Sequence, residues 1–243
     1  MSSADRAPDG VVRVRAPNPS PLTLDGTNSY VVGRWVVDPG PDHAGHLDAL
    51  LDAAGGRLDG IVLTHEHIDH AEGAQPLAER AGGVPVVQPR EGDEVGPFRA
   101  IATPGHAEDH VCLLMGSVCF SGDTVLGEGS VFVGFGGASM GDYMASLERL
   151  RELELEVMCP GHGPFVWDPR ARVEEYIAHR LDRERRVLEA LAAGARTHDE
   201  LLDLAWDDVD FTDAPMLRLA AAATLEAHLE KLRGEGRAPQ SGA

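Results

Sequence analysis

The sequence predicts an α/β sandwich that carries functional loops at the ends of its strands. Three observations support this fold class: short apolar runs typical of strands, segments of helical periodicity between them, and polar clusters directly after four of the runs. The 243 residues suffice for one large domain or a domain with a small appendage, and 43% hydrophobic residues suffice for a substantial core.

The first elements are a β-hairpin and a helix. Residues 29–33 and 34–40 are apolar runs that each end in glycine, which is typical of paired strands. Residues 46–56 place apolar side chains at helical spacing before a glycine stop. Beyond them we expect strands within 60–64, 84–89, 98–106, 110–123 and 155–163, and helices within 73–83 and 141–153.

The pattern changes after Pro169. Residues 171–194 predict one long helix, and residues 215–238 predict another that stops at a glycine. Between them, Thr197 is followed three residues later by Glu200, the pattern of a capping box at a helix start. Three helices with a short tail predict a small helical or winged-helix unit.

The charge balance limits the classes of partner. The net charge is −19, divided into −14 for residues 1–170 and −5 for residues 171–243. Such a field repels polyanions, so we expect no DNA partner, and RNA is disfavoured on this ground. No apolar run approaches the roughly 20 residues of a membrane span, and the polar N-terminus lacks a signal-peptide stretch. We therefore expect a cytoplasmic protein with no membrane partner, and the sequence leaves the oligomeric state open.

The three cysteines, Cys112, Cys119 and Cys159, each lie in an apolar context and lack metal-site spacing. This favours buried free thiols over disulfides.

Four polar clusters follow apolar strands: residues 64–70 (THEHIDH), 103–106 (TPGH), 120–123 (FSGD) and 159–163 (CPGHG). In open α/β folds, sites gather where strands end and loops begin. His65 and His67 share one side of an extended segment, and Asp69 and His70 follow where the chain must turn. Histidine and aspartate are ligand types that suit zinc.

The other clusters add the remaining ligand types. A second acid, Asp123, can bridge two cations, and His106 and His162 can complete two coordination spheres. An isolated HxH pair is weak evidence for a metal, because paired histidines occur on ordinary strands. The full set is much stronger, because so many imidazoles and carboxylates would otherwise be desolvated together without a cation.

This set resembles the metallo-β-lactamase superfamily, whose motif is HxHxDH followed by a further His, a bridging Asp and a last His. Residues 17–40 and 179–237 resemble the opening strands and the C-terminal winged-helix-like domain of the branch that contains beta-lactamase-like protein two. The resemblance implies a four-layer αββα catalytic domain at 11–170, after a mobile tail at 1–10 and before a winged-helix-like domain at 171–243. One departure is Glu72, where the motif has a small residue, which concerns the local loop geometry.

The resemblance also implies the cofactors and the reaction. Two zinc ions are expected, one held by His65, His67 and His106 and the other by Asp69, His70 and His162, with Asp123 bridging; iron or manganese are alternatives. Such a pair lowers the pKa of a bridging water to about 7, and the resulting hydroxide attacks the substrate. Asp69 is the expected catalytic residue, since it would orient the hydroxide and shuttle its proton.

Several other residues have weaker patterns. Asp38 is a candidate to fix a ligand histidine from behind, with a turn-forming role before Pro39 as an equal alternative. His110 and His179 are candidate substrate-binding residues, although packed or exposed positions explain them more simply. The remaining expectations are surface histidines at His43, His46, His198 and His228, ion pairs along a solvated helix for Arg180, Arg183, Arg185 and Arg186, and a substrate-contacting or irregular loop at 131–144.

The metal centre does not choose its substrate, so three functions remain. The first is hydrolysis of a small acyl compound such as a thioester or lactone. The second is cleavage of single-stranded RNA, an activity found in the branch that the chain resembles. The third is a non-enzymatic metal-binding regulator, against which the complete ligand set argues. The charge balance favours the acyl substrate over RNA.

Overall fold

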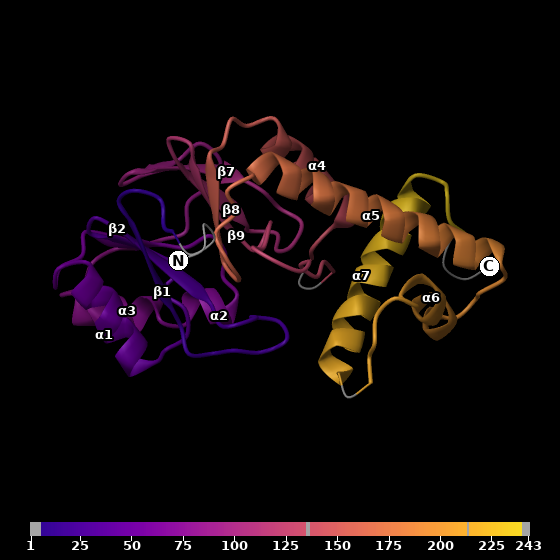
Figure 1. Cartoon of the computed structure of the whole chain (residues 1–243), viewed down its shortest axis with the longest axis horizontal. Coiled ribbons are helices and arrows are strands. Elements are labelled where there is room, and N and C mark those ends of the chain that lie inside the picture. Colours follow the sequence, from indigo (N-terminus) through magenta and orange to yellow (C-terminus); the bar gives the residue numbers. More distant parts are fainter. Residues whose placement is uncertain (1–5, 135–136, 213, 240–243) are drawn as a thin grey trace.

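The computed structural model describes residues 6–134, 137–212 and 214–239. Two five-stranded mixed sheets face each other, with helices on both outer faces and a helical group at the C-terminal end (Figure 1). The predicted αββα sandwich is therefore confirmed. Among the described residues, no helix is long and apolar enough to cross a membrane.

The first sheet has the order β1-β2-β3-β4-β5 and consists of β1 (Val11–Arg15), β2 (Asn28–Val32), β3 (Trp35–Val37), β4 (Gly60–Val62) and β5 (Val86–Val87). The predicted hairpin is the antiparallel pair β2–β3, and β3, β4 and β5 run parallel. Helices α1 (Ala44–Ala53) and α3 (Ala74–Arg80) cover its outer face, with Leu47, Leu50 and Leu77 packed in one apolar cluster with Ile61.

The second sheet has the order β10-β9-β8-β7-β6 and consists of β6 (Glu94–Val95), β7 (Phe98–Ala102), β8 (Val111–Met115), β9 (Val118–Gly122) and β10 (Val157–Pro160). Helices α4 (Met140–Arg151) and α5 (Pro169–Ala192) cover its outer face. The strands β1 and β6 were not among the expected elements, and both are short edge strands whose partners come from tertiary pairing.

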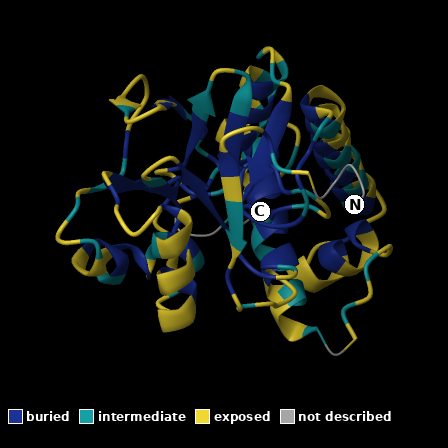
Figure 2. Cartoon of the chain, turned by 60° about the vertical axis from the view of Figure 1, so that its left-hand side comes forward, coloured by how far each residue is buried: buried dark blue, intermediate teal, exposed yellow. Residues whose placement is uncertain are grey.

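A third apolar layer fills the space between the two sheets. It includes Tyr30 from β2 and Phe120 from β9, whose rings meet edge to face with centroids 5.4 Å apart. Full burial of one such side chain stabilises the fold by roughly 1.5–3 kcal/mol. Figure 2 shows the strands buried at the centre and the exposed residues concentrated on the outer helices. The three cysteines are buried and free, as expected.

The C-terminal region consists of α5, α6 (His198–Ala205) and α7 (Pro215–Gly234), which enclose their own apolar cluster. The predicted capping box of Thr197 and Glu200 is present at the start of α6. The described residues after Pro169 include no strand, so the winged-helix detail is not confirmed.

The predicted boundary near residue 170 stays a prediction. Helix α5 packs its first half on the second sheet through Val173 and Tyr176, and its second half on α6 and α7 through Val187 and Ala190. The helix therefore belongs to the cores of both predicted domains. In the expected N-terminal tail, residues 1–5 lie outside the described part of the chain.

Candidate metal centre

The predicted ligands converge because they follow strands of both sheets. His65 lies just beyond β4, and α2 (Ile68–Ala71) begins directly after His67 and carries Asp69 and His70. Asp123 immediately follows β9, and His162 lies two residues after β10. The strand ends of the two facing sheets thus meet at one site, as the sequence pattern indicates.

The ligand atoms form two groups. The donor atoms of His65, His67 and His106 all lie within 4.8 Å of one another, as do those of Asp69, His70 and His162. These are the two sets that the family resemblance assigns to separate metals, and their roles as ligands are part of the function proposed below.

Asp123 lies between the two groups. Its Oδ1 is 3.4 Å from His70 Nε2, and its Oδ2 is 3.7 Å from His106 Nε2 in the other group. A carboxylate that reaches both groups with different oxygens has the geometry of a bridge between two cations.

The electrostatics of the second group favour cations. Burial opposes the charged form of His70, but the carboxylates of Asp123 and Asp69 outweigh it and raise its pKa well above the ordinary value. For His162 burial again lowers the pKa, but Asp123 and the hydrogen bond to Asp69 raise it to about 9. The two carboxylates thus create a negative potential that protons or metal ions can neutralise.

The first group is electrostatically different. Burial and the neighbouring His70 hold the pKa of His65 well below its usual value. Burial likewise lowers the pKa of His106, against the opposing effect of Asp123. Neutral imidazoles present the free ring nitrogens that metal coordination requires.

Two further features fit a metal. The ring nitrogens His65 Nε2 and His70 Nε2 and the oxygen Asp123 Oδ1 are buried without a hydrogen-bond partner in the described structure, an arrangement that a coordinated cation would satisfy. A Cβ at Gly161 would lie 2.3 Å from Asp123 Oδ1, so only glycine lets the backbone pass this close to the site.

Asp38 lies behind the ligands at the end of β3 with a positive φ of 48°. Its buried carboxylate accepts hydrogen bonds from the Thr64 amide and hydroxyl, both at 2.7 Å, and from His70 Nδ1 at 2.9 Å. The last bond leaves His70 Nε2 directed at the site. Asp38 thus contacts a histidine of the cluster and also lies at a backbone turn before Pro39, and its role in fixing a metal ligand stays a prediction.

A cavity of about 450 Å³ opens onto the site. Its floor is formed by ligand residues from both groups together with Asp123. Its walls come from a loop before β2, the segment that follows Asp123, and the start of α7: Pro21, Leu22, Leu24, Leu126, Glu128, Gly129, Ser130, Val131, Phe132, Met216, Leu217, Leu219 and Ala220. The start of α7 therefore forms part of the wall over the site, through residues that carry no signal in the sequence beyond being apolar.

The two candidate substrate residues lie outside this cavity's lining. His110 is 1% exposed, and it supports the site from behind: its Nε2 accepts a hydrogen bond from the Asp123 amide, and its Nδ1 lies 3.0 Å from the Thr103 hydroxyl. His179 lines a smaller, neighbouring cavity, where its Nδ1 is 3.4 Å from Ser130 Oγ. Direct contact of His110 with a substrate stays a prediction that this geometry does not favour, and contact of His179 stays a prediction that requires a substrate to reach the smaller cavity.

The segment Ser130–Val133 links the C-terminal helices to a ligand. His106 Nδ1 donates to the Phe132 carbonyl at 3.0 Å, while Thr224 of α7 accepts from the Val133 amide at 3.2 Å. The sequence pattern of residues 131–144 indicates either a substrate-contacting loop or an irregular connection, and Phe135 and Gly136 lie outside the described residues. Its bracing role depends on contacts across about 90 residues, which no local pattern reveals.

Several polar residues are more buried than expected. His46 and His228, predicted at the surface, are 4% and 0% exposed, because they sit on the inner faces of α1 and α7. Burial lowers the pKa of His46 to about 4 and that of His228 to about 3. Arg180 and Arg183 are also buried, so the interpretation of a fully solvated helix was wrong for them.

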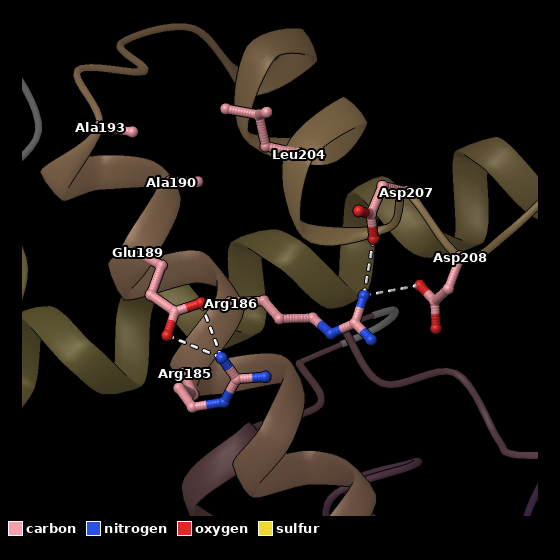
Figure 3. Close-up of a pocket in the computed structure, with 8 residues that line it drawn as sticks. All are labelled: Arg185, Arg186, Glu189, Ala190, Ala193, Leu204, Asp207 and Asp208. Atoms are coloured by element: carbon pink, nitrogen blue, oxygen red, sulfur yellow. Dashed lines mark hydrogen bonds and ion pairs between the residues drawn. The ribbon is translucent and has the colours of Figure 1, made fainter.

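Arg185 and Arg186 do form the expected exposed ion pairs. They line a surface hollow of about 620 Å³ between α5 and the residues that follow α6 (Figure 3). Arg185 contacts Glu189 at 2.7 Å, and Arg186 contacts Asp207 at 2.7 Å. These cations are neutralised by neighbouring acids, so the hollow is not a basic patch.

The unusual Glu72 points away from the metal centre and contacts the loop before α1. It lies at the exposed end of α2 with helical backbone angles, and its carboxylate accepts from the Asp42 amide at 3.2 Å. The next residue, Gly73, is the tightly packed one, since a Cβ there would lie 2.8 Å from Leu47.

Comparisons with known proteins agree with this geometry. The sequence profile of the metallo-beta-lactamase superfamily matches residues 22–100 and 90–162. A beta-lactamase-like protein 2 homolog of Drosophila melanogaster is 32% identical, over 98% of this chain and 92% of the relative. An atrochrysone carboxyl ACP thioesterase of Aspergillus fumigatus is 31% identical, over 79% of this chain and 72% of the relative.

Two solved structures extend the comparison. A metallo-beta-lactamase family protein from Thermus thermophilus superposes with a TM-score of 0.75 at 26% identity, over 96% of each chain. The protein TTHA1623, solved in a di-iron-bound form, superposes with a TM-score of 0.55 at 31% identity, over 67% of this chain and 98% of the other. With the profile spanning all four polar clusters, the chain belongs to the metallo-β-lactamase superfamily and is a metal-dependent hydrolase.

Proposed function

We propose that this protein is a dinuclear zinc hydrolase of small acyl compounds, with a thioester or a lactone-like ester as substrate. The observation that carries the proposal is the cavity over the two ligand groups, whose walls are almost entirely apolar. Apolar walls suit the hydrocarbon part of an acyl chain, while the polar floor suits its reactive carbonyl group. The thioesterase relative supports the same substrate class.

The metals would be held by the two groups described above, with Asp123 between them. When bound, the metals would lower the pKa of a coordinated water and would act as Lewis acids that stabilise the negative charge developing on the carbonyl oxygen. The mixed imidazole and carboxylate donors suit zinc, and they also suit iron or manganese, for which the di-iron relative is a precedent.

Asp69 would be the catalytic acid–base residue. It is the most exposed acid of the centre, with a side chain that is 26% exposed, and its Oδ2 lies 3.2 Å from His162 Nε2. Burial raises the pKa of Asp69, but the combined effect of His70 and the hydrogen bond to His162 is larger. The net pKa is therefore lowered, and the carboxylate is ionised at neutral pH. An ionised carboxylate at the cavity floor can accept a proton from the attacking water and return it to the leaving group.

Cleavage of single-stranded RNA is the alternative from family resemblance, and the cavity argues against it. The described lining contains no lysine or arginine and does contain Glu128, whereas a strand-binding groove needs cations along its path. A non-enzymatic DNA-binding regulator also lacks support, because the arginines of the surface hollow on α5 are paired with acids.

A substrate comparison on zinc-supplemented, full-length protein tests the proposal. The set comprises a hexanoyl thioester of N-acetylcysteamine, an acyl lactone, a β-lactam and labelled single-stranded RNA. We expect the thioester or the lactone to be hydrolysed fastest. Asp69→Asn should lower kcat by about 100-fold or more. Asp42→Asn, an exposed aspartate outside the cavity, serves as the matched control and should leave the rate unchanged.

The same comparison at two salt concentrations distinguishes acyl hydrolysis from cleavage of single-stranded RNA. Repulsion between a −19 protein and RNA weakens as salt is added, so any RNA cleavage should rise with salt. Efficient RNA cleavage at low salt, with thioesters and lactones ignored, would show that the proposed substrate class is wrong.

A further inference from the structure

A second, smaller cavity of about 160 Å³ lies next to the one over the metal centre. Four residues line both cavities, Ser130, Val131, Phe132 and Leu217, so they form a common wall. The wall includes Phe132, whose carbonyl accepts from the ligand His106. A substrate group in the smaller cavity would therefore lie one wall away from the metals.

Arg180 of α5 lines this smaller cavity and is 3% exposed. Its Nη2 donates to Ser130 Oγ at 2.7 Å and to the Val131 carbonyl at 2.5 Å, and its guanidinium lies over the Tyr143 ring. Its Nε is buried without a hydrogen-bond partner among the described residues. Within the same described part of the chain, no carboxylate lies within ion-pair distance of Arg180.

The neighbouring arginines of α5 differ in this respect. Arg183, on the wall of the same cavity, forms a two-pronged contact with the Asp208 carboxylate at 2.8 and 3.2 Å. Arg185 is paired with Glu189 (Figure 3). Arg180 is thus the buried cation on this helix whose charge is balanced only by neutral acceptors.

Around His179, the positive potential of Arg180 and Arg183 outweighs the opposing negative potential of Asp208 and Asp182. Burial, then Arg180 and Arg183, lower the pKa of His179 on the cavity wall to about 4. Burial and the same arginines, together with Lys231, lower the pKa of His228 behind it to about 3. Both imidazoles are therefore neutral at pH 7, and of the two arginines that line the cavity, Arg183 is paired with Asp208 whereas Arg180 has no carboxylate partner among the described residues.

An arginine in such a place is costly without a counter-ion, because a buried charge needs a partner of opposite sign. The missing partner fits in the cavity beside it. A volume of 160 Å³ is about that of five water molecules, enough for a small oxyanion. Guanidinium is also the group that recognises carboxylate and phosphate oxygens best.

We propose that this smaller cavity is an anion subsite, which binds a carboxylate or phosphate monoester at the remote end of the substrate. The substrate would extend from the larger cavity into the smaller one beside Leu217, which lines both. Its reacting carbonyl would then lie at the metals, and its anionic end would lie at Arg180. The inference rests on the proposed acyl hydrolase function and deepens it: the substrate is an acyl compound that carries a negative charge away from the scissile bond.

Two matched substrate pairs test the subsite and show whether it binds a carboxylate or a phosphate. Adipoyl and hexanoyl thioesters of N-acetylcysteamine differ by a terminal carboxylate. Hexanoyl phosphopantetheine and hexanoyl pantetheine differ by a phosphate. We expect zinc-supplemented wild-type protein to prefer the charged member of one pair by about tenfold in kcat/KM, the factor typical of a charge-assisted hydrogen bond. The pair that shows the preference identifies the anion.

Substitutions then assign the preference to Arg180. Arg180→Gln should abolish the preference within the pair, and Arg180→Lys should retain most of it. The readout is the ratio of kcat/KM between the charged and the uncharged member of a pair. A general loss of activity caused by disturbing Ser130 or Val131 affects both members equally and cancels in this ratio. Leu217→Glu is a second variant that leaves Arg180 in place, and its carboxylate on the common wall should also reduce the ratio. Arg185→Gln, on the exposed side of the same helix, should leave the ratio unchanged.

A binding measurement separates failure of the subsite from failure of the acyl function. Adipate and inorganic phosphate are titrated separately into full-length protein, and the midpoint of thermal unfolding is followed for wild type and Arg180→Gln. Stabilisation by one of them that requires Arg180 supports the subsite even if no thioester is hydrolysed. Equal ratios and equal stabilisation in wild type and Arg180→Gln would overturn the subsite, while thioester hydrolysis itself would still stand.

Discussion

Asp38→Asn is expected to weaken one metal position without unfolding the protein. Asp38 is 2% exposed and accepts three hydrogen bonds, two from Thr64 and one from His70 Nδ1. Asparagine keeps the shape of the side chain and, like aspartate, tolerates the positive φ of 48° at this position. The substitution therefore changes one terminal atom and one charge.

The consequence falls on His70. In the wild type, a carboxylate oxygen can only accept, so His70 keeps its proton on Nδ1 when a metal displaces the proton from Nε2. In Asp38→Asn the amide oxygen is expected to keep the bond from the Thr64 amide, which turns the NH₂ group toward His70 Nδ1. The ring then accepts at Nδ1 and carries its proton on Nε2, the atom that faces the metal site. Loss of such a supporting contact typically costs 10- to 100-fold in metal affinity, about 1.4–2.8 kcal/mol.

The assay is competition between the metal-stripped full-length protein and a chromophoric chelator, fitted with two sites. Only the site of Asp69, His70 and His162 should weaken, while the site of His65, His67 and His106 should keep its affinity. Thermal unfolding of the metal-free proteins checks that the fold is intact. Asp42→Asn, an exposed aspartate four residues along the chain, is the control. Two metals bound by Asp38→Asn with wild-type affinity would refute the role assigned to Asp38.

Three further predictions concern the metal count, the bracing of the centre and the pH dependence. Elemental analysis should find two zinc equivalents per wild-type chain and at most one in Asp123→Ala, because the Asp123 carboxylate reaches both proposed ligand groups. One metal or none in the zinc-supplemented wild type would contradict the dinuclear proposal. Thr224→Val removes the acceptor for the Val133 amide and should lower the free energy of unfolding by about 1 kcal/mol in urea titrations, whereas no change would show that the contact does not brace the segment. His228 has a folded pKa of about 3 against 6.5 unfolded, so the unfolded state binds the extra proton and stability falls as pH drops below 6.5. From pH 7 to pH 5 this residue should cost about 2 kcal/mol, a loss that His228→Leu should abolish in urea titrations at both pH values; an unchanged pH slope would be the contrary result.

The convergence of the proposed ligands could be predicted from the sequence because each lies within a short motif next to a strand. Three histidines and an aspartate lie within the six residues from His65 to His70, where the chain leaves a strand. The apolar run directly before this motif identifies that strand. Helices α1, α4 and α5 were predictable for a similar reason, since their periodicity extends over ten residues or more. Local signals of this kind do not depend on the rest of the chain.

The environment of the centre was not predictable, because it depends on contacts between residues that are far apart in sequence. Arg180 looks like part of a solvated charged helix, yet α7 and the segment after Asp123 bury it. His228 lies in an alanine-rich helix whose periodicity is too uniform to mark the inner face. Met216, Leu217, Leu219 and Ala220 give no sign in the sequence that they line a cavity over His67, Asp123 and His162.

These long-range contacts also imply that the C-terminal helices do more than cover the cavity. Arg180 of α5 holds the Val131 carbonyl, Thr224 of α7 holds the Val133 amide, and the Phe132 carbonyl between them accepts from the ligand His106. Two helices therefore fix the segment that orients this ligand. Helices that only formed a wall of the cavity would affect the substrate and leave the metal affinity unchanged. Because these helices also hold the segment whose Phe132 carbonyl accepts from His106, a substitution that disturbs their contacts is expected to alter metal affinity as well as substrate binding.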